Sequence, residues 1–349
     1  MTTEIHNSLD QNSDTDKELR NLFEKLETET CRTVDITNSF DITDVHQQRD
    51  AAECLEMILH KVSPQASQVF KGQLKYSTTC SKGHNLNTET NPFLTLPLSL
   101  KDANNSTFSV ESGFDNVFQT KSFIGDNLVY CEQCGKKTEA TRECEMLEFP
   151  RILVLLLKRF DFDNNTMSHF KSDRMVVMPH TLQRQNKMYT LCGIVNHMGS
   201  LKGGHYTATI LSKEDNTWCE FNDSHVRKLE EQPFANSQTY NSSTAYLLVY
   251  RDSEGFRDKV EHRQDEQSGD QRERNRKVKV SSLIQEDPLL PEKPRQDREA
   301  EEGTQQSKRQ EECTSLTNIL KKPPCIALIV CGGLLIVILA IILSTLNLS

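Results

Sequence analysis

Positive charge is in deficit along the sequence: 41 lysine and arginine residues stand against 50 aspartate and glutamate residues, for a formal net charge of −9. A chain that binds nucleic acid through its general surface needs the opposite balance, so we do not expect nucleic acid as a partner. The sequence also contains no glycine-rich phosphate loop and no His-Glu-x-x-His motif. The second absence excludes a metalloprotease of the type that this motif defines.

Residues 1–20 lack an apolar run and are polar and acidic. We therefore expect no signal peptide, and the chain should begin in the cytosol. The 11 cysteines are odd in number and follow no regular spacing, which argues against the disulfide framework of a secreted domain. A reducing compartment is the expected location of the folded part.

A long uncharged apolar run occurs near the C-terminus, at residues 325–346. A helix of this length can cross the ~30 Å hydrocarbon core of a membrane. Lys321 and Lys322 precede the run and residues 347–349 follow it, so the positive-inside rule keeps the N-terminal side in the cytosol. We expect a single-pass, tail-anchored membrane protein; the endoplasmic reticulum and the mitochondrial outer membrane are equally open as targets.

Composition divides the rest of the chain. Nearly half of residues 251–310 are charged, and Phe256 is their one aromatic side chain. Such a segment buries too little apolar surface to offset the cost of ordering its backbone. We therefore predict a disordered linker at 253–322, a folded domain at 18–252 and a flexible N-terminus at 1–17.

Two helices are predicted early in the folded domain, at 17–26 and 50–61, because apolar residues recur there at helical spacing. From residue 72 onward the pattern changes to β-rich runs, separated by polar turns such as 81–91 and 163–166. The domain should therefore begin with helices and continue as a sheet.

One segment of this predicted sheet carries chemistry. His205 follows Gly203 and Gly204 at the start of a strand, and Asn222 and Asp223 end a later strand. A hairpin could set the amide of Asn222 against the imidazole, and a thiolate nucleophile needs an imidazole oriented in this way. From the spacing alone, an ordinary hairpin histidine is the simpler interpretation.

Five segments match a known family in order along the chain. They are a glutamine-aspartate helix box at 48–55, a strand at 93–98, a Cys-x-x-Cys pair at 131–134, a strand at 150–160, and a histidine box formed by 202–208 and 221–226. Together they resemble the ubiquitin-specific proteases, which are cysteine deubiquitinases. The resemblance implies an α+β fold with an incomplete helical thumb lobe, an antiparallel β palm and β fingers. It also implies hydrolysis of ubiquitin isopeptide or thioester bonds, with ubiquitin and ubiquitinated proteins as partners.

The resemblance assigns His205 as the general base, Asn222 as the residue that orients it and Asp223 as an assisting acid. The family's Gly-Asn-Thr-Cys box, which carries the nucleophile, has no counterpart. Cys31 is the one cysteine ahead of Cys54, and it lacks the glycine and asparagine of the box, so it is interpreted as an ordinary thiol. We expect a chain that begins after the box and is inactive as written. It is either a truncated product of a longer enzyme or a membrane-anchored, ubiquitin-binding pseudoenzyme.

A zinc site is the one cofactor that the sequence suggests. Cys131 and Cys134 have the spacing of half a zinc knuckle. The resemblance places the other half at Cys80, where Gly83 stands at the family's second cysteine position and His84 lies within reach. Three cysteines and one histidine bind zinc tetrahedrally and leave no position for water, so the metal would be structural. A metal-free finger tip with plain thiols remains the alternative.

Overall fold

The computed structural model describes residues 9–26, 34–42, 49–101, 107–201, 203–212, 215–223 and 225–253. Its helices are α2 (Asp14–Leu26), α3 (Val34–Ser39), α4 (Ala51–Lys61), α5 (Pro64–Ser67) and α6 (Val110–Val117), with 3-10 turns η1 (Gln68–Phe70) and η2 (Gly125–Asn127). The first half of the strands comprises β1 (Gly72–Cys80), β2 (Asn85–Phe93), β3 (Thr95–Ser99), β4 (Thr107–Ser109), β5 (Lys121–Phe123), β6 (Val129–Cys131), β7 (Lys136–Thr138), β8 (Ala140–Glu148) and β9 (Ile152–Lys158). The second half comprises β10 (Phe160–Asp163), β11 (Ser168–Lys171), β12 (Met175–Pro179), β13 (Thr181–Arg184), β14 (Lys187–Ser200), β15 (Gly203–Leu211), β16 (Trp218–Asn222), β17 (His225–Lys228), β18 (Thr239–Ser242) and β19 (Ala245–Asp252).

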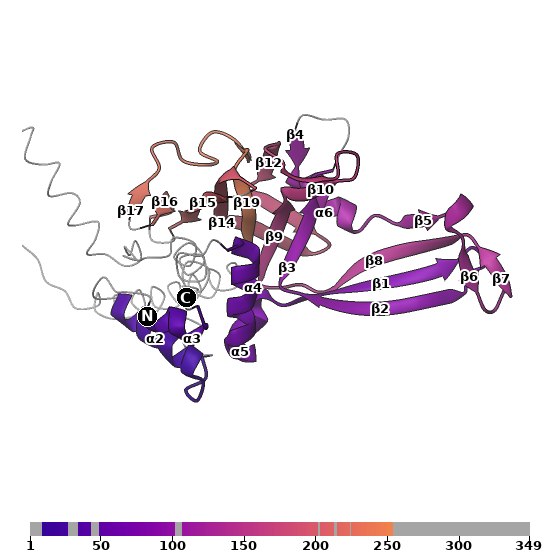
Figure 1. The fold of residues 1–349 in the computed structure, drawn as a ribbon, viewed down its shortest axis with the longest axis horizontal. Coiled ribbons are helices and arrows are strands. Elements are labelled where there is room, and N and C mark those ends of the chain that lie inside the picture. Colours follow the sequence, from indigo (N-terminus) through magenta and orange to yellow (C-terminus); the bar gives the residue numbers. More distant parts are fainter. Residues whose placement is uncertain are drawn as a thin grey trace, which may run out of the picture. The chain divides into compact units, whose positions relative to one another are not determined.

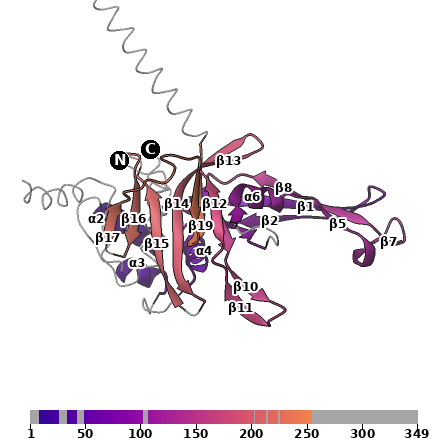
Figure 2. The ribbon, with the colours of Figure 1, turned by 90° about the horizontal axis from the view of Figure 1, so that it is seen from above.

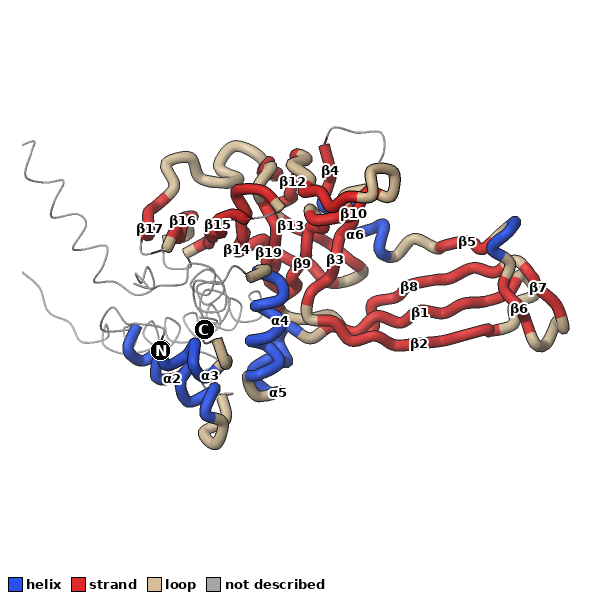
Figure 3. The backbone as a smooth tube through the Cα atoms, in the orientation of Figure 1, coloured by secondary structure: helices blue, strands red, loops and turns tan. Residues whose placement is uncertain are grey.

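Two sheets organise the described residues. The palm sheet has the strand order β17-β16-β15-β14-β19-β9-β3, with β13 paired to β14. The finger sheet has the order β2-β1-β8-β5 and projects as a long ribbon away from the palm sheet (Figure 1). Among the described elements, α2 to α5 precede the first strand, α6 lies between β4 and β5, and strands dominate from residue 72 onward (Figure 3). The predicted α+β class is therefore confirmed. The predicted antiparallel palm needs one correction, because β3 pairs with β9 in parallel at the edge of the sheet.

The centre of the palm sheet is buried on both faces, and β9 shows this most clearly. Ile152 and Val154 belong to a core cluster shared with α2, α3, α4 and α5. Leu153, Leu155 and Leu157 belong to a second cluster shared with α6 and β12. Successive side chains of a strand point to opposite faces, so a continuous apolar run fits a sheet covered on both sides. In Figure 2, α4 and α6 lie near the palm strands that they cover.

The structure corrects the predicted start of the first helix. α2 begins at Asp14, inside the segment 1–17 that the composition predicts to be flexible. Ser13 Oγ accepts the backbone N–H of Asp16 at 3.3 Å, as an N-cap side chain does. The Asp16 carboxylate is buried and accepts the backbone N–H of Ser63 at 3.0 Å. These two contacts order a polar stretch that has no apolar periodicity of its own.

A second correction concerns a predicted turn. Residues 85–91 lie in β2, not in a turn, and pair with β1 in the finger sheet. β2 is an edge strand with most of its side chains exposed. An edge strand whose two faces are both exposed to solvent needs no alternation of apolar and polar residues. The sequence of β2 therefore gives no strand signal. The turn predicted at 163–166 is confirmed between β10 and β11.

Several predicted features lie outside the described residues: Cys31, the membrane span at 325–346 and, apart from Ser253, the linker at 253–322. Among the helices that the structure does describe, none is both long enough and apolar enough to cross a membrane.

Candidate functional site

His205 and Asn222 meet at the end of the palm sheet. His205 lies near the start of β15 and Asn222 ends β16, and the two strands are antiparallel neighbours. His205 Nε2 lies 2.7 Å from Asn222 Oδ1. An amide oxygen can only accept a hydrogen bond, so Nε2 carries the proton and donates it. The lone pair of the neutral ring is therefore on Nδ1, which is the atom left to accept a proton.

Asp223 completes this group at longer range. Its Oδ2 lies 3.9 Å from His205 Nε2, which is beyond hydrogen-bond distance. Asp223 has a φ of 49°, a left-handed conformation that aspartate tolerates in tight hairpin turns. The side chains of His205 and Asp223 are 43% and 44% exposed, so solvent screens their interaction. The structure thus brings together all three residues that the sequence selects for the histidine box.

Glycine is required beside His205 because the neighbouring strand comes too close for a side chain. A Cβ at Gly204 would lie 2.2 Å from Nε2 of His197 and 2.5 Å from the carbonyl oxygen of Met198. Gly199, which pairs with Gly204 across the hairpin, has a φ of +119°. The glycines therefore let β14 and β15 approach closely at the point where β15 presents His205.

The N-terminus of α4 lies beside this strand. Asp50 accepts the backbone N–H groups of Ala52 and Glu53 as the N-cap of α4. Its second carboxylate oxygen accepts the hydroxyl of Tyr246 at 2.5 Å. Burial, followed by this hydrogen bond, raises the pKa of Tyr246 far above its usual value. The phenol therefore stays protonated and ties α4 to β19.

An aromatic cluster adjoins the histidine box. His197 packs at 5.1 Å from Phe160 and at 4.7 Å from Tyr206, and Phe160 packs at 5.5 Å from Tyr246. Burial is the main cause that raises the pKa of Tyr206 and lowers that of His197, so both rings are neutral at pH 7. Sequence reasoning did not select Asp50, His197 or Tyr246 as site residues. For Asp50, the helix box at 48–55 was the available signal.

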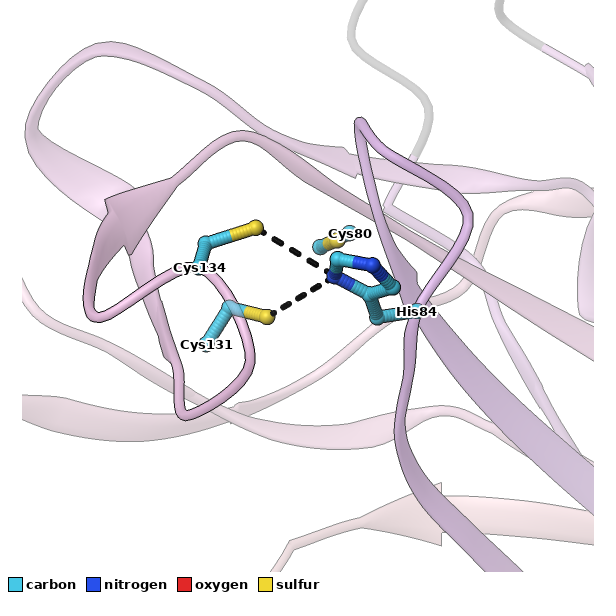
Figure 4. A group of neighbouring side chains, drawn as sticks. All are labelled: Cys80, His84, Cys131 and Cys134. Carbon is cyan, nitrogen blue, oxygen red and sulfur yellow. Dashed lines mark hydrogen bonds between the residues drawn. The ribbon is translucent and has the colours of Figure 1, made fainter.

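The predicted metal ligands come together at the tip of the finger sheet. Cys80 ends β1, His84 precedes β2, and Cys131 and Cys134 flank the turn between β6 and β7. All four ligand atoms lie within 4.8 Å of one another. His84 Nδ1 lies 3.3 Å from Cys134 Sγ and 3.5 Å from Cys131 Sγ, and Figure 4 shows the ring directed at both sulfurs. The cluster could therefore hold a metal ion.

Local backbone geometry prepares this cluster. The Cys80 sulfur accepts the backbone N–H of Lys82 at 3.4 Å. Burial opposes ionisation of Cys80, but hydrogen bonds from the backbone of Lys82 and His84 and with the neighbouring thiols together outweigh it and lower the pKa of Cys80. Burial and the neighbouring thiols raise the pKa of Cys134 to about 11. A cation would be needed to hold several thiolates together, and zinc suits three sulfurs and one imidazole nitrogen.

The comparisons with known proteins agree with this geometry. The family model described as ubiquitin carboxyl-terminal hydrolase matches residues 1–250. Ubiquitin carboxyl-terminal hydrolase 47 from Xenopus tropicalis is 26% identical over a gapped alignment of 356 positions that spans 72% of this chain and 26% of that protein. The corresponding human protein is 26% identical over a gapped alignment of 328 positions that spans 67% of this chain and 24% of that protein. The chain thus spans about a quarter of the length of these relatives.

Solved structures support the fold. The SAGA DUB module that contains Ubp8, bound to monoubiquitin, matches with a TM-score of 0.55 and 24% sequence identity, over 71% of this chain and 62% of that chain. The same module bound to ubiquitin aldehyde matches with a TM-score of 0.53 and 22% identity. At this identity the likeness concerns the fold.

Proposed function

Because the chain belongs to the ubiquitin carboxyl-terminal hydrolase family, whose model matches residues 1–250, we propose that it binds ubiquitin and carries the imidazole half of a cysteine deubiquitinase site. The observation that carries this proposal is the hydrogen bond from His205 Nε2 to Asn222 Oδ1 at 2.7 Å. It leaves Nδ1 free to act as the general base.

The pair could serve each step of a cysteine hydrolase. Nδ1 of His205 accepts the proton of a thiol, and the resulting thiolate attacks the carbonyl carbon of the scissile amide. The imidazolium then returns the proton to the departing amine, and water hydrolyses the thioester to restore the thiol. Asn222 keeps the ring in one tautomer throughout, and Asp223 adds screened electrostatic support for the imidazolium.

The described part of the palm sheet and α4 offers no thiol suited to act as the nucleophile. Cys54 lies near Tyr206, but it is 5% exposed, and burial raises its pKa to about 11. Cys192 and Cys219 are also buried. A nucleophilic cysteine needs exposure and a lowered pKa, so these described palm and α4 thiols are unsuited to the role. We therefore propose that the 349-residue chain does not turn over ubiquitin conjugates by itself.

A non-catalytic role is the second candidate. The same lack of an activated thiol among the described residues favours a chain that binds ubiquitinated proteins without cleaving them. The two candidates predict the same binding and differ in covalent chemistry. A cysteine box supplied by a longer product of the gene would favour the enzyme.

The deciding experiment exposes the full chain to ubiquitin that carries a C-terminal thiol-reactive electrophile and measures intact mass. Binding to unmodified ubiquitin is measured in parallel by titration calorimetry. We expect binding without an adduct. A covalent adduct that disappears in His205→Ala but persists in His60→Ala would overturn the proposed inactivity, and absence of binding by the folded chain would overturn ubiquitin recognition.

We also propose that the chain is tethered to a membrane. Residues 325–346 form an uncharged apolar run preceded by Lys321 and Lys322, which supports a single-pass span with the folded domain in the cytosol. A ubiquitin-binding domain held in this way would act on proteins at that membrane. The endoplasmic reticulum and the mitochondrial outer membrane fit the run equally well.

A further inference from the structure

We propose that Lys171 is a positioning residue for His205: its ammonium completes the open edge of β14 and so holds the hairpin that presents the imidazole to Asn222. Lys171 lies at the end of β11, in the β10–β11 hairpin, and is remote in sequence from the histidine box. Its side chain is only 6% exposed.

A buried ammonium requires partners, and those of Lys171 are informative. Lys171 Nζ donates to the carbonyl oxygen of Gly199 at 2.9 Å and to that of His197 at 3.2 Å. It also lies 3.3 Å from Oδ1 of Asp173, a side chain that is 76% exposed. Burying a charge costs free energy unless it is well hydrogen-bonded. The two carbonyls are therefore the partners that stabilise the ammonium inside the protein.

These carbonyls lie where β14 loses a neighbour. The pairing of β14 with β19 ends at Asn196 and Ala245. The backbone N–H of His197 still donates to the carbonyl of Thr244 at 2.8 Å, so the backbone groups of His197 face the β19 side. Beyond this point, no described strand pairs with that edge of β14. Lys171 takes the place of the missing strand by binding the carbonyls of His197 and Gly199.

The opposite edge of the same segment holds His205. Met198 lies between the two clamped carbonyls and pairs with His205 across the hairpin. Backbone groups alternate in direction along an antiparallel strand, so those of Met198 face β15 when those of His197 face β19. Fixing His197 and Gly199 therefore fixes the backbone to which the His205 segment is paired, and with it the approach of the ring to Asn222.

Arg159 holds the backbone segment that follows Lys171 in place. Its side chain is fully buried, and its NH1 donates to the carbonyls of Ser172 and Arg174 at 2.9 Å each. Its Nε donates to the carbonyl of Ala245 at 2.5 Å. Burial lowers the pKa of Arg159 to about 10, with Asp173 opposing the shift, so the guanidinium remains charged at pH 7. Arg159 thus holds the residues that follow Lys171 against the start of β19. The backbone that carries the Lys171 side chain is therefore fixed in position.

The test follows the tautomer of His205 in the full chain labelled with 15N-histidine. Long-range proton–nitrogen correlations give the shifts of the two ring nitrogens, which lie far apart when one tautomer is held and draw together when tautomers interconvert. His205→Gln assigns the signals, and Asn222→Ala sets the full effect of losing the acceptor. We expect Lys171→Met to reduce the shift difference between the two ring nitrogens of His205 by at least half as much as Asn222→Ala does. Lys171→Arg should keep the wild-type difference, because a guanidinium also donates to both carbonyls.

Lys75→Met serves as the matched control, since Lys75 forms an exposed ion pair with Glu145 in the finger sheet. An unchanged His205 separation in folded Lys171→Met would overturn the inference. Collapse of all histidine signals in Lys171→Met would overturn it as well, because the lysine would then stabilise the whole fold and not one hairpin.

Lys171 matters for chemistry only if His205 has the role proposed above, but the readout needs no ubiquitin. A chain that fails to bind ubiquitin and still shows the Lys171-dependent tautomer would contradict the proposed function but support the positioning role of Lys171. A chain that binds ubiquitin but whose His205 tautomer does not depend on Lys171 would support ubiquitin recognition and overturn the positioning role of Lys171.

Discussion

At the scale of single residues, Gly204 shows how little freedom the histidine box has. Its backbone lies against the imidazole of His197 and the carbonyl of Met198, and a Cβ would approach these groups to 2.2 Å and 2.5 Å. The Met198 oxygen is backbone within a paired strand, so it cannot move aside as a flexible side chain would. The contact must therefore be relieved by a shift of β15, which carries His205.

Gly204→Ala tests this constraint. We expect a loss of about 2–3 kcal/mol in the free energy of unfolding, as for other overpacked sites, measured by chemical denaturation of the full chain. Gly125→Ala is the control, because Gly125 has a φ of +61° but open space around it and should cost only about 1 kcal/mol. Equal losses for the two variants would contradict the steric explanation.

His197 makes a prediction about pH. Burial lowers its pKa in the folded state, and Lys171 and Arg159 lower it further, against Asp50 and Asp173. The unfolded chain binds a proton near the usual pKa of about 6.5, while the folded chain does so only at lower pH. The stability associated with neutral His197 is thus complete above about pH 6.5 and is lost as the pH falls toward its folded pKa.

Unfolding titrations between about pH 7.5 and 5, a range that brackets the usual histidine pKa of about 6.5, check this sign. We expect His197→Phe to flatten the loss of stability on acidification relative to the wild-type chain. His60→Phe, at an exposed position on α4, should leave the slope unchanged. A wild-type chain that becomes more stable as the pH falls from about 7.5 to 5 would refute the lowered pKa of His197.

At the scale of elements, the finger tip depends on ligands more than on a core. β6 and β7 form a two-stranded sheet separate from the finger sheet, and Ile124 and Tyr130 nearby are each 58% exposed. Such a small sheet buries too little apolar surface to be stable alone. The cluster of Cys80, His84, Cys131 and Cys134 is the feature that can hold β6, β7 and the β1–β2 turn together.

Metal removal is the corresponding prediction. We expect the reduced full chain to retain a single zinc ion, and a chelator to speed hydrogen exchange at residues 124–138 while leaving the palm sheet unchanged. Elemental analysis of Cys134→Ser should show strongly reduced zinc, whereas Cys219→Ser, which removes a buried palm thiol, should not. A reduced wild-type chain without zinc would favour the metal-free finger tip instead.

At the scale of the whole molecule, the apolar run at 325–346 predicts a membrane span. An arginine near the centre of a spanning helix costs about 2.5–3.5 kcal/mol, so paired arginines should abolish insertion. We expect the full chain expressed in cells to resist carbonate extraction. The double variant Leu335→Arg with Ile338→Arg should instead become extractable.

The double variant Leu289→Arg with Leu290→Arg, in the predicted linker, is the matched control for the added charge. It should behave as the wild-type chain does. Extraction of the unmodified chain by carbonate would contradict the proposed membrane tether.

The sequence by itself determined the early helices and the change to strands from residue 72 onward, because periodicity is a local signal. The candidate residues of both sites were selected by short motifs that stand in the order of a known family. The sequence also predicted that Asn222 meets His205 and that His84 joins three cysteines, and the geometry agrees on both. The contact between His205 and Asn222 forms between the neighbouring strands β15 and β16, whose register follows from a short connection.

The tertiary structure alone decided the contacts that join distant segments. Lys171 reaches the carbonyls of His197 and Gly199, Asp50 accepts the hydroxyl of Tyr246, and β2 finds its place as a polar edge strand. None of these has a periodic signal, because a single buried polar group is satisfied by whichever backbone the fold brings to it. The residues proposed to act chemically can therefore be selected from the sequence, while the residues that hold them in position are identified only from the folded structure.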